Sequence, residues 1–98
     1  MKVIYDPRVV KFLDRLSRKD KSKVREYILF FEEYGFNLDT RYLKKVLKDV
    51  WELRPGRVRL FLYLSKNQLV AVHANYKKSR KITEKDLKII KDRIRQYI

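Results

Sequence analysis

The chain contains no cysteine, a single histidine, two glycines and two prolines. Without cysteine, disulfide bonds and thiolate metal sites are impossible. The one histidine, His73, has no second histidine or cysteine to join it as a metal ligand, and no glycine-rich phosphate loop occurs. We therefore expect no metal and no small-molecule cofactor, although a magnesium site built from carboxylates alone stays formally open. The composition fits a cytoplasmic protein.

Long apolar segments are also absent. No run approaches the roughly 18 residues that a membrane-spanning helix requires. The N-terminus lacks the basic start followed by an apolar stretch that marks a signal peptide. Basic residues are spread through the whole chain instead. These absences argue against a membrane as the partner.

Positive charge is what the chain has in excess. Its 98 residues include 26 Lys and Arg but only 12 Asp and Glu, for a formal net charge of +14. Charge of this density attracts nucleic acid or an acidic protein. Because 45% of the residues are hydrophobic, the chain can bury a core, and its length suits a single domain over residues 1–98.

The order of expected elements is β, α, α, β, β, β, α. After an extended start at 1–5, Asp6 and Pro7 open a helix, and a second helix ends at Gly35. Residues 36–48 are ambiguous and could contain a short helical turn. Strands are expected at 50–54, 57–64 and 69–76, followed by a helix capped by Thr83 with Asp86. This order predicts an α+β domain with its helices on one face of an antiparallel sheet.

The strand at 57–64 has two chemically different faces, because side chains alternate along a strand. One face carries Val58, Leu60, Leu62 and Leu64. The other carries Arg57, Arg59, Phe61 and Tyr63. Cations beside aromatics suit phosphates and stacked bases, so we expect Tyr63 to contact RNA. The alternatives are that the arginines are ordinary exposed strand residues and that the two aromatics pack under helices.

Basic residues from neighbouring strands should converge near one edge of the sheet. Such a group suits RNA cleavage by attack of the 2′-hydroxyl on the neighbouring phosphorus, because fixed cations stabilise the charge that develops on the phosphate. Proton transfer requires a carrier as well, and the available ones are Glu52, His73 or a lysine. A lone histidine is more often structural, and a basic loop can simply be solvated. The converging cations are Arg54, Arg57, Arg59, Lys77, Lys78, Arg80 and Lys81.

Four segments together resemble the RelE/HigB superfamily of toxins from toxin–antitoxin modules. They are WELR at 51–54, RVRLFLY at 57–63, HANYKKSRKIT at 73–83 and the final KDLKIIKDRIRQY. The resemblance implies a RelE-like fold and a metal-independent, ribosome-dependent mRNA endoribonuclease that a small antitoxin neutralises. Its partners would be the ribosome, mRNA and a cognate antitoxin.

The resemblance also implies roles for particular residues. Arg59 matches the strand arginine that contacts phosphate, and Lys78 or Arg80 matches the basic positions after the last strand, with Arg54 and Lys81 as secondary candidates. Glu52 stands where RelE has a lysine, and no tyrosine stands at the corresponding start of the last helix. This pattern favours the HigB-like branch and leaves the general base open among Glu52, His73 and the lysines.

Two other functional classes stay open from the sequence. The first is a ParE-like toxin directed at gyrase, which would remain toxic after mutation of Arg59 and Lys78. The second is a non-catalytic RNA- or DNA-binding module, which would bind with a steep salt dependence but never cut.

Overall fold

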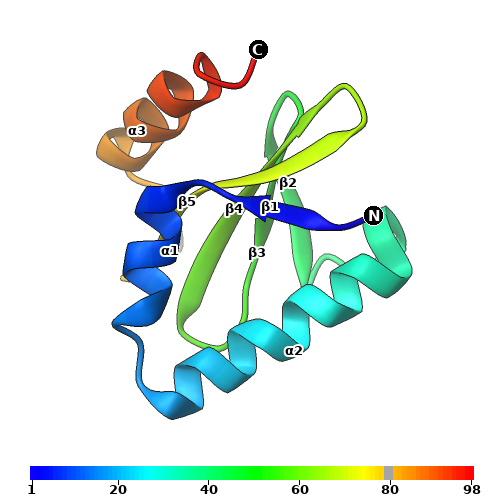
Figure 1. Ribbon diagram of the computed structural model, residues 1–98, viewed down its shortest axis with the longest axis vertical. Coiled ribbons are helices and arrows are strands. Elements are labelled where there is room, and N and C mark those ends of the chain that lie inside the picture. Colours follow the sequence, from blue (N-terminus) through cyan, green and yellow to red (C-terminus); the bar gives the residue numbers. More distant parts are fainter. Residues whose placement is uncertain (79–80) are drawn as a thin grey trace.

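The computed structural model describes residues 1–78 and 81–98. Figure 1 shows its elements, and the chain order is β1 (Val3–Tyr5), α1 (Pro7–Asp14), α2 (Arg18–Tyr34), the 3₁₀ turn η1 (Gly35–Asn37), β2 (Leu43–Leu47), β3 (Val50–Leu53), β4 (Val58–Ser65), β5 (Gln68–Tyr76) and α3 (Glu84–Ile94). This is an α+β architecture, as expected, and it is compatible with a RelE-like fold.

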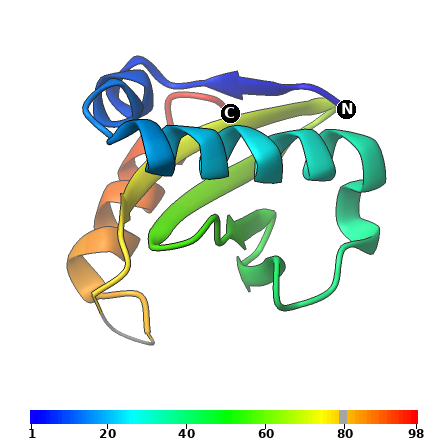
Figure 2. The same cartoon turned by 90° about the horizontal axis from the view of Figure 1, so that it is seen from below.

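The sheet differs from the expected one in two respects. Its strand order is β1-β5-β4-β3-β2, and β1 runs parallel to β5, so the sheet is mixed rather than antiparallel. The ambiguous segment contains the strand β2, paired antiparallel with β3, and no α-helix. Figure 2 shows β1 and the β2–β3 pair on opposite sides of α2.

The helix boundaries follow the expected capping residues. Asp6 accepts a hydrogen bond from the Arg8 amide at the start of α1, where Pro7 is the first helical residue. Gly35 ends α2 with a φ of 60°, a conformation that glycine adopts without steric cost. Thr83 caps α3 by accepting from the Asp86 amide. These three predictions are confirmed.

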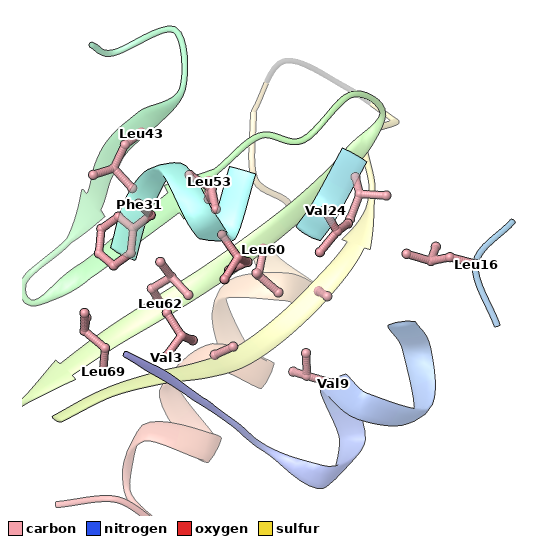
Figure 3. Packing of buried hydrophobic residues seen from close by; sticks show 14 residues of the cluster. Val3, Val9, Leu16, Val24, Phe31, Leu43, Leu53, Leu60, Leu62 and Leu69 are labelled. Carbon is pink, nitrogen blue, oxygen red and sulfur yellow. The ribbon is translucent and has the colours of Figure 1, made fainter. Parts of the chain in front are cut away.

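Helices cover both faces of the sheet, so the prediction of a single covered face is wrong. α1 and α2 pack on one face, where Val58, Leu60 and Leu62 of β4 lie in the first apolar cluster. Figure 3 shows Leu60 and Leu62 beside Val24 and Phe31 of α2. α3 packs on the other face, and Figure 1 shows β4 and β5 passing between α2 and α3.

The second face carries the aromatics of β4. Phe61 is fully buried there with Val72 and Ile90, and Tyr63 packs partly buried against the same group. The predicted alternation of β4 is therefore confirmed, but these rings are core residues beneath α3. Tyr63 is not an open platform for RNA bases.

A bulge in β5 sets the side chains that face α3. Phe61 pairs with His73 while Leu62 pairs with Ala71, so Val72 is the extra residue. A bulge redirects side chains locally, and here both Val72 and His73 face α3. The Arg93 guanidinium donates a hydrogen bond to the Val72 carbonyl oxygen at 2.8 Å, which supports the bulge from α3.

Within the described residues, no helix has both the length and the apolar character needed to cross a membrane.

Candidate functional site

A buried ion cluster lies on the α3 face of the sheet. Glu52 of β3 and Arg59 of β4 are each 2% exposed. The Glu52 carboxylate contacts a different arginine with each oxygen: Oε1 accepts from Arg54 Nε at 2.5 Å, and Oε2 lies 3.2 Å from Arg59 Nε as an ion pair without hydrogen-bond alignment. Arg59 Nη1 also donates to the Lys81 carbonyl oxygen at 3.4 Å. Three predicted site residues therefore meet at one carboxylate.

Burial changes what these residues can do chemically. Ions taken out of water need partners, because leaving one unpaired costs several kcal/mol. Glu52 satisfies that need for Arg59, and its own two oxygens are occupied. Glu52 is 2% exposed and is consequently placed to hold two arginines in position, whereas a general base needs an oxygen within reach of the substrate.

His73 takes part in a second polar network centred on Asp86. His73 Nε2 lies 2.8 Å from Asp86 Oδ1, and the ring stacks on Phe61 with centroids 5.6 Å apart. Burial lowers the pKa of His73 below its ordinary value, against the opposing effect of Asp86. A neutral His73 donates its Nε2–H to the carboxylate, since the latter has no proton to give.

Asp86 is held ionised by the groups around it. Burial acts to raise the pKa of Asp86, but donated hydrogen bonds outweigh burial and keep that pKa below its ordinary value. The donors are His73, Thr83 and Asn75. Thr83 gives the shortest of the measured contacts, with its hydroxyl 2.7 Å from Asp86 Oδ2.

The two networks border a cavity of about 370 Å³ between β4, β5 and the start of α3. Arg59, Lys78 and Asp86 contribute to its wall, and Tyr76 stands at the same wall, 37% exposed. Two exposed cations and one buried arginine would attract a phosphate, and Tyr76 offers a ring for a base. Cations, a carboxylate and an aromatic thus meet in one space of nucleotide size. The remaining lining residues are Phe12, Asn75, Thr83 and Lys85.

Other predicted residues lie around this cavity without lining it. Arg57 pairs with Asp20 at 2.9 Å and lies over the Tyr76 ring, with its side chain 68% exposed. The hydrogen bond from Arg57 lowers the pKa of Asp20. The Lys77 amide donates to the Arg57 carbonyl oxygen at 2.7 Å. Arg57 therefore braces Tyr76 rather than reaching into the cavity.

The structure separates some predicted residues from this group. Arg54, Lys81 and Glu52 border a different cavity, beside β2. His73 lines neither cavity and touches the first one only through Asp86. The predicted RNA-binding residue Arg80 lies outside the described residues.

Sequence reasoning missed the place of Asp86 in the cavity wall. The Thr83–Asp86 spacing was interpreted only as a helix cap, although an acidic cap residue at the start of a helix that follows a basic loop also lies near those cations. Within residues 1–78 and 81–98, no three histidine or acidic side chains gather as a group able to hold a metal ion.

The α+β fold is compatible with a RelE-like protein, and comparison with protein families identifies the family. The chain belongs to the family described as Phage derived protein Gp49-like (DUF891), whose model matches residues 11–95. This is a family of RelE/HigB-type toxins in toxin–antitoxin systems. Membership implies a cognate antitoxin as a partner. No curated protein matches the chain.

Proposed function

We propose that this toxin is a ribosome-dependent mRNA endoribonuclease of the HigB-like branch, cleaving without a metal in the cytoplasm. The observation that carries the proposal is the 370 Å³ cavity in which Arg59, Lys78 and Asp86 meet. Family membership supports the toxin class, and the cavity chemistry supports RNA as the target.

The proposed reaction joins the ribose 2′-oxygen to the neighbouring phosphorus and breaks the bond from phosphorus to the 5′-oxygen. The products are a 2′,3′-cyclic phosphate and a 5′-hydroxyl. Arg59 and Lys78 stabilise the negative charge that builds up on the phosphate, and each such donor can contribute about 10²-fold or more in rate.

Proton transfer is assigned to groups on the same wall. Asp86 is the carboxylate among the described cavity-lining residues, and its lowered pKa keeps it ionised at neutral pH. It accepts the proton from the 2′-hydroxyl, while a lysine ammonium returns a proton to the 5′-oxygen. A low pKa makes Asp86 a weak base, so we expect its contribution near the lower end of the usual 10²-fold to 10⁴-fold.

A translation extract tests the proposal directly. Purified protein is added, and new mRNA 5′ ends are mapped by primer extension. Lys78→Ala removes an exposed cation of the cavity, whereas Lys88→Ala removes an exposed lysine of α3 that lines neither cavity. We expect new ends within translated codons for the wild type and for Lys88→Ala, and about 10²-fold fewer for Lys78→Ala.

Intact mRNA on actively translating ribosomes would overturn the nuclease proposal. A gyrase-directed toxin would instead be indicated if the Lys78→Ala variant still inhibited growth and if the protein abolished DNA supercoiling by gyrase. RNA binding without cleavage or growth inhibition would indicate a plain binding module.

A further inference from the structure

We propose that a second cavity, beside β2, binds the adjacent nucleotide of the same RNA strand, with Lys44 contacting its phosphate. The inference rests on the proposed function for the identity of the strand. This cavity has a volume of about 280 Å³, and the cations in its wall are Lys44, Lys45, Arg54 and Lys81. Ile82 and Leu87 give it an apolar wall against which a base or ribose can lie.

The strand register places Lys44 at this cavity. Lys44 pairs with Glu52 across β2 and β3, and directly paired residues point to the same face of a sheet. Lys44 therefore lies on the α3 face with the buried ion cluster. The next residue, Lys45, pairs with Trp51 and holds its ammonium 5.3 Å from the centroid of that ring. Although Lys45 borders the cavity, its charge is directed to the other face.

The charges around the second cavity do not balance. Glu52 is the acidic residue in its wall, and both carboxylate oxygens already contact arginines. Among the described residues, Lys44 forms no ion pair of its own. The cavity thus has a surplus of positive charge, which an anion would neutralise.

The position of the second cavity indicates a strand rather than an isolated anion. The Glu52–Arg59 ion pair gives one residue to each cavity, since Arg59 lines the first and Glu52 lines the second. Lys81 lines the second cavity and accepts the Arg59 hydrogen bond with its carbonyl oxygen. Two nucleotide-sized spaces joined at one ion pair match a polymer with a phosphate at every residue. In an acidic protein segment, by contrast, the spacing of the charges depends on the sequence.

The test uses a probe that cannot be cut. A fluorescein-labelled RNA hexanucleotide with 2′-O-methyl groups throughout lacks the attacking hydroxyl, so binding is measured by anisotropy regardless of cleavage. We expect Lys44→Ala to weaken binding about tenfold, as for the loss of one charge-assisted contact. It should also make the slope of log affinity against log salt shallower by about 0.7, the value for one phosphate contact on a single strand.

Lys88→Ala is the matched control, because it removes an exposed lysine of α3 that lines neither cavity. It should leave affinity and salt slope at the wild-type values, and thermal melting should show both variants folded. Equal effects of Lys44→Ala and Lys88→Ala would overturn the inference. So would unchanged RNA binding by Lys44→Ala together with weakened capture of the antitoxin, which would assign the cavity to an acidic protein.

The outcome is separable from that of the nuclease proposal. A specific loss of RNA binding in Lys44→Ala, without any cleavage of mRNA in the translation extract, supports the second site and refutes the nuclease. Cleavage by the wild type with unchanged RNA binding by Lys44→Ala supports the nuclease and refutes the second site.

Discussion

Arg59 and Glu52 depend on each other because each is only 2% exposed. The carboxylate provides the counter-charge that lets the arginine stay beneath α3, 2% exposed. Arg54 shares the carboxylate but keeps about a quarter of its side chain exposed, so it can be solvated if the pair is disturbed. Stability and the proposed phosphate binding are thereby linked in the Arg59 side chain.

Removal of one partner of this pair should be costly. Arg59→Met leaves Glu52 buried with only Arg54, and we expect the free energy of unfolding to fall by about 3 kcal/mol. The double variant Glu52→Leu, Arg59→Met removes both charges and should lose much less stability, while still failing to cleave RNA. Urea denaturation measures both effects. A double variant as unstable as Arg59→Met would show that packing, not the unpaired carboxylate, sets the cost.

The buried histidine makes stability depend on pH. The pKa of His73 is lower in the folded protein than its ordinary value of 6.5, so the unfolded chain takes up a proton more readily. Its contribution to stability is therefore complete above pH 6.5 and is lost as pH falls toward the folded pKa. Asp86 titrates below its ordinary value of 3.8 and does not affect this range.

We expect the urea midpoint of the wild type to decrease between pH 7 and pH 5. His73→Gln keeps a donor for Asp86 but does not titrate, so its midpoint should change less over the same range. Parallel curves for the two proteins would exclude His73 as the source of the pH dependence.

Individual residues show why the sequence predicts part of the site and not all of it. Arg59 and Lys78 were predicted from composition and resemblance, and they do line one cavity. The contact of Glu52 with Arg54 and Arg59 was not predictable, because it depends on which side chains α3 excludes from water. The assignment of Tyr63 to RNA failed because the sequence pattern of cations beside aromatics is the same whether or not a helix covers that face of the strand.

Among the elements, α3 contributes most to the arrangement of the candidate site on its face of the sheet. It covers Phe61 and Tyr63, supports the β5 bulge through Arg93, and carries Asp86 at its start. Its first turn is fixed by Thr83, whose hydroxyl oxygen accepts from the Asp86 amide and whose proton goes to the Asp86 carboxylate. One cap therefore holds both the helix and the proposed proton acceptor.

Loss of this cap should destabilise the protein modestly. Thr83→Ala removes the side-chain partner of the Asp86 amide, and we expect the free energy of unfolding to fall by about 1 kcal/mol. Thr83→Ser retains the hydroxyl and serves as the control, with a value close to the wild type. The measurement is again urea denaturation at neutral pH. An unchanged midpoint for Thr83→Ala would mean that the first turn of α3 is held by its packing alone.

The strand β2 could not be predicted from its own pattern of hydrophobic and polar residues. Leu43, Val46 and Leu47 do not alternate with polar residues, and the pairing with β3 shifts between Lys45 and Leu47. An edge strand of this kind is defined by its neighbour rather than by its own period. The parallel pairing of β1 with β5 was missed for a related reason, since three residues carry no signal of their partner. The helix caps, by contrast, are local, and they were predicted correctly.

At the scale of the whole molecule, the charge of +14 acts before any specific contact forms. Long-range attraction speeds the encounter with an anionic partner, which is RNA in our proposal, and it weakens as salt screens the charges. If the two cavities hold three to four phosphates, the slope of log affinity against log salt for the uncleavable hexanucleotide should be about −2 to −3. Lys88→Ala should keep that slope. A slope near zero would contradict electrostatic binding of the strand.

The parallel pairing of β1 with β5 has a consequence for synthesis of the toxin. Val3 leaves the ribosome well before its strand partner Leu69 of β5, and the Asp6 carboxylate accepts a hydrogen bond from Tyr97 at 2.6 Å. The nascent chain therefore cannot close its sheet edge or assemble the cavity wall until β5 and α3 have emerged. The toxin therefore cannot complete its fold until most of this chain has been made, and an antitoxin already present can meet it as soon as it folds.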